Sequence, residues 1–255
     1  MKKIFLLAGA MAMLVVSSCK KDNNSNDGNN NNGGSAKLLK KVTKTESGAT
    51  TVYNLTYDGN KLTSLTSNDN LESSVFTFDG SGNIVKLAIR DNNDYSTYTY
   101  TYSDGIPVSG TVKTWCKVAG EPDELTQDDV ITYTVVNGKV TKMNQQMKLD
   151  GVALASTLTY DSNGNLAKVQ TEGDEPFAVT FTYGTKRSGF PNISKWVLDL
   201  GYTLQFYAKN ETLAAFYDFP GTQFDETITT KYTYDAAGYP LTSDDGETQL
   251  KFEYQ

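Results

Sequence analysis

Carboxylates are the side chains here that could do acid-base chemistry, because the chain contains no histidine. Without imidazole it cannot build a Ser-His-Asp or Cys-His nucleophile system or a His-ligated zinc site. A glycosidase would need two carboxyl groups about 5 to 10 Å apart across a sugar, whereas neighbours on a strand point to opposite faces. We therefore interpret the local acidic groups as solvated loop charges. They are Asp123-Glu124, Asp128-Asp129, Asp225-Glu226 and Asp244-Asp245-Glu247.

Trp115 is the candidate binding residue, since its spacing from Lys113 and Lys117 places the three side chains on one face of a strand. An exposed indole beside two ammonium groups could stack on a sugar ring and hydrogen-bond its hydroxyls. The alternative is that the lysine stems simply cover the ring. Cys116 falls on the opposite face with Val112 and is predicted to be a small packing residue, not a reactive thiol.

Other polar clusters predict turns. The Asp/Asn-rich stretches 91–94 and 161–165 lack the distal Glu of a 12-residue calcium loop. The Lys186-Arg187 pair could bind an anion or could be a basic loop tip.

We expect no metal, no cofactor, no catalytic residue and no enzymatic activity. The net charge of −7 also disfavours a nucleic-acid partner.

The N-terminal residues predict an export signal. Two lysines precede an uncharged apolar run, residues 4–16, which is shorter than the roughly 20 residues that span a bilayer. The tetrad Val16-Ser17-Ser18-Cys19 resembles a bacterial lipoprotein signal, which implies that residues 1–18 are removed and Cys19 is acylated. The alternative is an ordinary secretory signal with an incidental cysteine.

Residues 19–36 form the second segment, a lipidated cysteine followed by an Asn-rich sequence with almost no apolar side chains, which predicts a flexible tether. Lys20-Lys21-Asp22 after Cys19 resembles a signal for sorting to the outer membrane. We expect lipid anchoring there, with the cell surface and the periplasmic face both open.

Residues 37–255 are predicted to be one domain built from a repeated hairpin. The clearest copies are residues 55–62, 76–84, 158–166 and 232–241, each with an aromatic or Leu, Thr, an aromatic and then Asp before a Gly-containing turn. The step from Tyr57 to Phe78 is 21 residues and from Phe78 to Tyr102 is 24. A period this short fits two strands and two turns.

Aromatic residues alternate with threonine through these copies, as in Tyr98/Tyr100/Tyr102 with Thr99/Thr101 between them, which is typical of a half-buried strand. The first apolar residue after each turn (Ile84, Val140, Leu166) falls out of this phase and predicts a β-bulge at the turn exit. The repeat aspartates, which precede the turns, are predicted to cap them. These are Asp58, Asp79, Asp161 and Asp235.

About eight such units predict an all-β, antiparallel up-and-down meander of about 16 short strands, with no helix. A sheet of this size should curl into a barrel or shell with its aromatic face inward. Trp196, Leu198, Leu200 and the residues in phase with them up to Phe206 are predicted as one further core strand. Strands of five to eight residues argue against a transmembrane barrel, whose strands need 9 to 11.

The aromatic-Thr-aromatic-Asp-x-x-Gly-Asn block resembles the tyrosine-aspartate repeats of the RHS and teneurin type. With its lipoprotein-like start, the whole chain resembles Gram-negative outer-membrane lipoproteins of unknown function that have a porin-like β fold. The arginine usual after the last glycine is absent, since Asn83, Asn165 and Tyr239 stand there. The resemblance implies a fold and an address, and no catalytic residue.

Together these features predict a cell-envelope lipoprotein that is a non-enzymatic binding or structural module. Its expected partners are the membrane, through the lipid anchor, and a glycan or envelope protein, which are equally open. The alternative function is a carboxylate-dependent polysaccharide hydrolase, which requires an inward-facing pair of acids within a cleft. A transmembrane pore is a third possibility.

Overall fold

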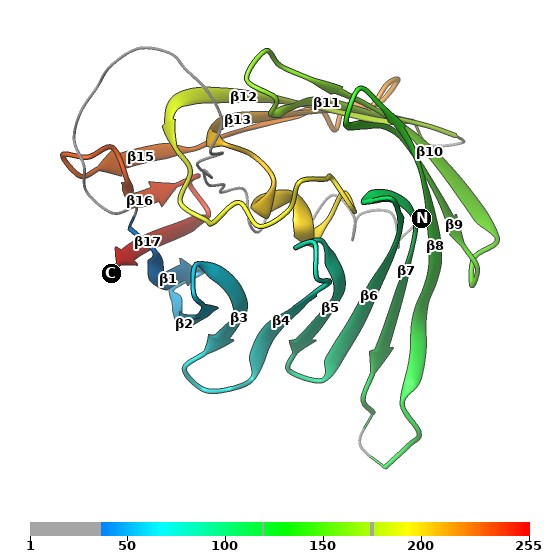
Figure 1. Ribbon diagram of the computed structural model, residues 1–255, viewed down its shortest axis with the longest axis horizontal. Helices are drawn as coiled ribbons and strands as arrows, with labels where there is room; N and C mark the ends of the chain where they lie inside the picture. Colours follow the sequence, from blue (N-terminus) through cyan, green and yellow to red (C-terminus); the bar gives the residue numbers. More distant parts are fainter. Residues whose placement is uncertain (1–36, 119, 174–175) are drawn as a thin grey trace.

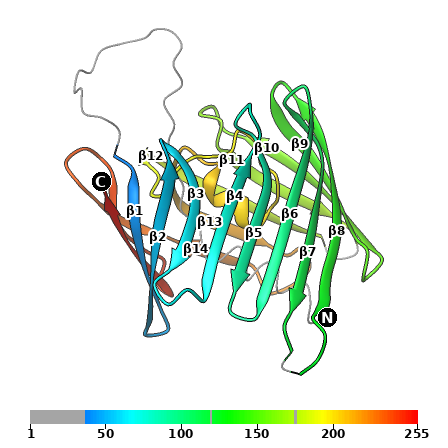
Figure 2. The same cartoon turned by 60° about the horizontal axis from the view of Figure 1, so that its bottom comes forward.

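Antiparallel strands run back and forth through residues 37–118, 120–173 and 176–255, the parts of the chain that the computed structural model describes. The predicted signal peptide, Cys19 and the tether lie outside these residues. The last strand pairs with the first, from Leu39↔Tyr254 to Glu46↔Thr248, which brings the sheet into a barrel (Figures 1 and 2). The strands are β1 (Leu39–Glu46), β2 (Ala49–Asp58), β3 (Lys61–Ser67), β4 (Glu72–Phe78), β5 (Ile84–Asp91), β6 (Asp94–Ser103), β7 (Ile106–Cys116), β8 (Glu124–Val136), β9 (Lys139–Met147), β10 (Val152–Tyr160), β11 (Leu166–Glu172), β12 (Phe177–Arg187), β13 (Asn210–Asp218), β14 (Glu226–Thr229), β15 (Lys231–Tyr234), β16 (Pro240–Asp244) and β17 (Thr248–Tyr254).

β14 and β15 are the two halves of one chain pass, since a single residue, Thr230, separates them. β14 pairs with β13, whereas β15 pairs with β16. The Thr230 backbone N–H still donates to the Leu213 carbonyl at 2.9 Å, so the chain changes partner just after this residue. The seventeen strands are therefore sixteen passes around a nearly closed barrel, which confirms the predicted meander.

Alternation decides which side chains face inward. Phe76 and Tyr100 are buried, while their sequence neighbours Thr77, Thr99 and Thr101 are exposed, as the period-2 pattern predicts. The expected strand length was wrong for part of the barrel, because β7 has 11 residues and β8 has 13. Paired Ser, Thr and charged side chains extend these two strands beyond the aromatic pattern that defined the repeat.

The repeat turns fold as their aspartates require. Asp79 accepts hydrogen bonds from the backbone N–H groups of Ser81 and Asn83 at 2.9 and 2.8 Å, and Asp161 and Asp235 cap equivalent loops. Among the described residues Asp58 makes no such bond. The prediction of capping is confirmed for three of the four aspartates.

A β-bulge lies at each of these turns, and at several bulges a tyrosine hydroxyl binds the backbone. The register shifts between Thr77 and Phe78 and between Thr159 and Tyr160, which confirms the predicted bulges. The carbonyl of the first apolar residue after three turns (Ile84, Val140 and Leu166) accepts a tyrosine hydroxyl from the next unit, and the carbonyl of Leu39 at the start of β1 accepts one in the same way. These bonds are Tyr57 to Leu39 (2.7 Å), Tyr102 to Ile84 (2.8 Å), Tyr160 to Val140 (2.7 Å) and Tyr183 to Leu166 (2.9 Å), and we call them the tyrosine latches.

A segment of the chain fills the barrel. Between β12 and β13, residues 188–209 leave the wall and cross the interior as coil with one short 3₁₀-helix, η1 (Tyr202–Phe206), seen in yellow inside the ring of strands in Figure 1. We call this segment the plug. The expectation of a strand through Trp196 to Phe206 was wrong in its geometry, although Leu198, Leu200 and Phe206 are core residues as expected.

The plug is held by the barrel wall. Phe206 packs edge-on against Phe76 and Phe190, with ring centroids 5.2 and 5.7 Å apart. Wall tyrosines also bind its polar groups, since Tyr100 donates to the Asp199 carboxylate at 2.8 Å and Tyr133 donates to the Leu198 carbonyl at 2.6 Å. The interior is thus a packed core. Among the described residues no helix has the length and apolar character needed to cross a membrane.

Candidate functional site

Two cavities flank the plug, one at each end of the barrel. One has a volume of about 790 Å³ and lies where the repeat turns gather; we call it the basic cavity. The other has a volume of about 830 Å³ and is lined at the opposite end by the β5–β6, β7–β8 and β9–β10 hairpins; we call it the acidic cavity. Both volumes lie in the range of small-molecule sites.

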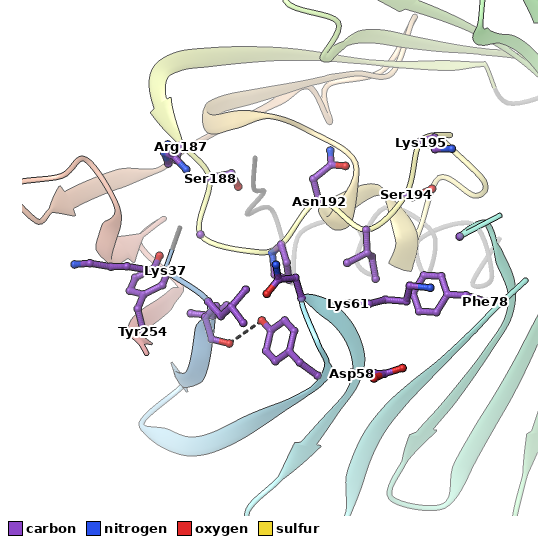
Figure 3. Close-up of a pocket in the computed structure, with 18 of the residues that line it drawn as sticks. Lys37, Asp58, Lys61, Phe78, Arg187, Ser188, Asn192, Ser194, Lys195 and Tyr254 are labelled. Atoms are coloured by element: carbon purple, nitrogen blue, oxygen red, sulfur yellow. Dashed lines mark hydrogen bonds between the residues drawn. The ribbon is translucent and has the colours of Figure 1, made fainter. Parts of the chain in front are cut away.

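The basic cavity takes its wall from the repeat turns and its floor from the start of the plug. The β2–β3 turn contributes Tyr57 and Lys61, and the β4–β5 turn contributes Phe78. In Figure 3, Lys61 lies beside Phe78 on the right of the view, while Arg187 and Lys37 lie on the left. Its charged lining residues are Lys37, Asp58, Lys61, Arg187 and Lys195.

Cations and aromatic rings are paired in this cavity. The Lys61 ammonium nitrogen is 4.8 Å from the centre of the Phe78 ring. The Arg187 guanidinium carbon is 4.9 Å from the centre of the Tyr239 ring, and one of its N–H groups donates to the Tyr239 hydroxyl at 3.2 Å. Stacking holds each cation in place while leaving N–H donors for a ligand.

Among the described residues, Lys37 is the one cation of this set that forms an ion pair. Its ammonium group lies 2.6 Å from an Asp235 carboxylate oxygen, and this contact lowers the pKa of Asp235. Arg187, Lys61 and Lys195 outnumber the one acid of the lining, Asp58, so the cavity presents a net positive charge. Such a site can bind a carboxylate or phosphate group and stack a flat or pyranose ring against an aromatic side chain.

The predicted residues Trp115, Lys113 and Lys117 lie at the β7–β8 end of the barrel, outside the lining of both cavities. The Trp115 ring stacks on Tyr95, with centroids 5.2 Å apart and planes inclined by 11°. Lys117 lies 5.7 Å from the centre of the Tyr95 ring, and Lys113 lies 3.6 Å from Asp128. The structure brings the three to one face, and their role in glycan binding stays a prediction.

The interpretation of Asp128-Asp129 as a solvated loop pair was wrong. Both residues lie within β8, where Asp128 faces outward between Lys113 and Lys148, and Asp129 faces inward. The Asp129 side chain is only 2% exposed. The spacing showed that the two carboxylates diverge, but only the barrel shows that one of them enters a cavity.

Cys116 lines the acidic cavity rather than the apolar core. Asp94 across the strand pair, with burial and the nearby Glu124 and Asp123, raises the pKa of its thiol. The thiol therefore stays protonated at neutral pH, consistent with an unreactive cysteine. Sequence reasoning did not place it among acids, because Asp94 and Glu124 come from two different neighbouring strands.

Comparisons with solved structures support the fold. The chain is similar to a porin-like protein from Bacteroides vulgatus ATCC 8482, with a TM-score of 0.55, 14% identity and coverage of 86% of this chain and 99% of that one. It is also similar to a porin-like protein from Bacteroides uniformis ATCC 8492, with a TM-score of 0.52, 15% identity and coverage of 85% and 96%. No family model and no curated protein matches the chain. The predicted porin-like β fold is confirmed.

Proposed function

We propose that this chain is a non-enzymatic, lipid-anchored binding protein of the cell envelope, and that the basic cavity binds a glycan carrying an acidic group. The observation that carries the proposal is the filled barrel. Phe190, Leu198 and Phe206 of the plug pack against the wall in the interior, so the open volume lies at the ends and not along the axis. A rigid barrel with an open, charged end suits binding.

The lining of the basic cavity supports a sugar acid as the ligand class. Arg187 offers a planar set of donors that matches a carboxylate, and Lys61 adds a second positive charge. Tyr57 and Phe78 offer rings against which a pyranose can stack. Asn192 and Ser194 also line the cavity, but their side chains already bind the plug backbone at Tyr207 and Trp196.

The envelope location rests on the lipoprotein-like start and on the porin-like proteins from Bacteroides. The Val16-Ser17-Ser18-Cys19 tetrad would place a lipid anchor 18 residues before Lys37, the first described residue. An anchored, filled barrel would hold its cavity near the membrane without forming a channel. Replacing Cys19 by Ala should move the full chain from the membrane fraction to the soluble fraction of cells.

The inward-facing acids give limited support to the alternative, a polysaccharide hydrolase. Asp129 and Asp199 both line the acidic cavity, and burial raises the pKa of each. Asp199, however, already accepts four hydrogen bonds from Tyr100, Gly201 and Thr203, which commits it to holding the plug. Among the described residues this leaves Asp129 as the one other buried carboxylate of the lining, because the remaining lining acids are exposed, whereas a glycosidase needs a positioned pair.

Calorimetric titration of the full chain in mild detergent tests the proposal. Oligosaccharides of a uronic acid should bind, and matched neutral oligosaccharides should bind at least about tenfold more weakly, as expected for loss of a charge-assisted hydrogen bond. Arg187→Gln with Lys61→Gln should weaken binding by a similar factor or more. Trp115→Ala should leave the affinity unchanged.

Three results would overturn this assignment. Equal affinity for acidic and neutral sugars would remove the role of the cations. Loss of binding in Trp115→Ala alone would move the site to the outer wall. Release of reducing ends during incubation, abolished by Asp129→Asn, would establish the hydrolase instead.

A further inference from the structure

The acidic cavity carries a second set of features that the proposed function does not use. It lies at the other end of the barrel from the basic cavity, beyond η1 and Leu200 of the plug. Among the described residues its lining contains no lysine or arginine. Its acidic lining residues are Asp91, Asp94, Glu124, Asp129, Asp150 and Asp199.

Asp199 binds groups of the plug. Asp129 is the most deeply buried of the other acids in the lining. Gln127 and Gln145 donate to its Oδ2 atom at 2.6 and 2.7 Å, which leaves Oδ1 without a hydrogen bond among the described residues. Lys113 and Lys148 bind the neighbouring Asp128 on the outer face instead. A carboxylate that is 2% exposed and has no cationic partner is costly unless something else supplies the charge.

A second group in this cavity also lacks a partner. Tyr217 is 4% exposed, lines the cavity, and its hydroxyl makes no hydrogen bond among the described residues. A free phenolic oxygen can accept a hydrogen bond from an N–H donor. At the mouth of the same cavity, the hydrogen bond with Asp94, burial and the nearby Glu124 raise the pKa of the Cys116 thiol.

The walls favour an organic cation over a bare metal ion. Aromatic rings line the cavity at Tyr98, Phe181 and Tyr183, and such rings attract ammonium groups. Within the part of the chain that the structure describes, no three acidic or cysteine side chains converge closely enough to hold a metal ion. Acids spread around about 830 Å³ fit a ligand of several atoms better than a point charge.

We propose that the acidic cavity is a second binding site, which takes a primary ammonium group and neutralises it with Asp129. The ammonium donates to the free Oδ1 of Asp129 and the surrounding acids attract the cation, while the hydroxyl of Tyr217, elsewhere in the lining, can accept a hydrogen bond from another donor of the same ligand. An amino sugar and a lysine side chain carry the same group, so both are candidate sources. This site is independent of the basic cavity, so a result against one of the two proposals leaves the other unaffected.

Calorimetric titration of the full chain in detergent tests this site with amine-bearing probes and their acetylated counterparts. A glucosamine oligomer and a lysine tripeptide should each be compared with the N-acetylated form, which has the same framework without the positive charge. At least one amine should bind about tenfold or more tightly than its acetylated form. The probe that binds identifies the source of the ammonium group.

Asp129→Asn and Asp128→Asn are the matched variants, since both remove one carboxylate from β8, the first from the inner face and the second from the outer face. Asp129→Asn should weaken amine binding about tenfold, while Asp128→Asn should leave it within about twofold. Equal effects of the two variants, or equal binding of the acetylated probes, would overturn the proposal. Calcium chloride titrated alone and bound with the same dependence on Asp129 would replace it with a metal site.

Cys116 provides a readout that does not depend on the Asp129 variant. In a full chain with Cys19→Ala it is the one remaining thiol, and the midpoint of its pH–rate profile with a neutral haloacetamide reports its pKa. A bound ammonium should lower this midpoint, because it opposes the field of Asp94 and Glu124. An unchanged midpoint at saturating amine would place the bound amine elsewhere and overturn the proposal.

Discussion

The tyrosine latches make a quantitative prediction about stability. Tyr102 and Tyr160 each donate a hydroxyl hydrogen bond to a carbonyl at a bulge, across 18 and 20 residues of sequence. Replacing either tyrosine by phenylalanine keeps the ring and removes only the hydroxyl. The carbonyls of Ile84 and Val140, which belong to fully or nearly fully buried residues, then lose this partner.

The expected cost follows from that loss. An intramolecular hydrogen bond contributes about 0.5 to 1.5 kcal/mol, and a polar group left unpaired in the interior adds a desolvation cost. We therefore expect each of Tyr57→Phe, Tyr102→Phe, Tyr160→Phe and Tyr183→Phe to lower the free energy of unfolding by about 1 to 2 kcal/mol. For a domain of this size that corresponds to a fall in Tm of about 3 to 6 °C.

Tyr232→Phe is the matched control in the same barrel. The Tyr232 hydroxyl is buried and has no hydrogen-bond partner among the described residues, so its removal should be neutral or stabilising. Urea denaturation followed by tryptophan fluorescence, supported by the melting temperature, compares the five variants. If Tyr232→Phe costs as much as the latch variants, hydroxyl bonding to the bulges does not stabilise the barrel and the argument fails.

Three further perturbations probe the plug. Gly189→Ala should cost about 1 to 3 kcal/mol, because an added Cβ would lie 2.6 Å from the Phe252 ring, whereas Gly80→Ala meets nothing within 4 Å and should be near neutral by the same denaturation assay. Phe206→Ala should cost about 3 to 5 kcal/mol, since the side chain is fully buried between wall and plug. Burial raises the pKa of Asp199 above its ordinary 3.8, so its stabilising contribution is present below that pH and is lost as pH rises through the raised value. The stability deficit of Asp199→Asn relative to wild type should therefore be larger at acid pH than at neutral pH, and a deficit that grows with pH would contradict this cause.

The sequence predicted the wall of the barrel well, because each strand carries its own local signals. Alternating Thr and aromatic residues specify the inward face, and the slip at Ile84 or Leu166 specifies the bulge. The latches could not be predicted, since they need the position of the next hairpin. They nevertheless explain why tyrosine, and not phenylalanine alone, precedes several of the turns.

The plug was missed because its apolar residues imitate a strand. Trp196, Leu198, Leu200 and Leu204 recur at even spacing, as along a strand, yet each is placed by contacts inside the barrel and not by strand pairing. The physical reason for a plug is the width of the barrel. Eight strands give an interior that side chains just fill, while sixteen leave a channel, so sixteen passes packed as a core require extra chain inside.

Charge distribution explains why composition could not reveal either cavity. The net charge of −7 suggests an evenly acidic molecule, but the strands carry cations and acids to opposite ends. Lys61 and Arg187 reach the end where the repeat turns lie, whereas Asp94 and Glu124 reach the other end from separate hairpins. Successive turns of a meander alternate between the two ends of the barrel. The turn in which a residue lies therefore decides at which end of the barrel it is found. Two sites of opposite charge can therefore be encoded along one repeat without any local cluster in the sequence.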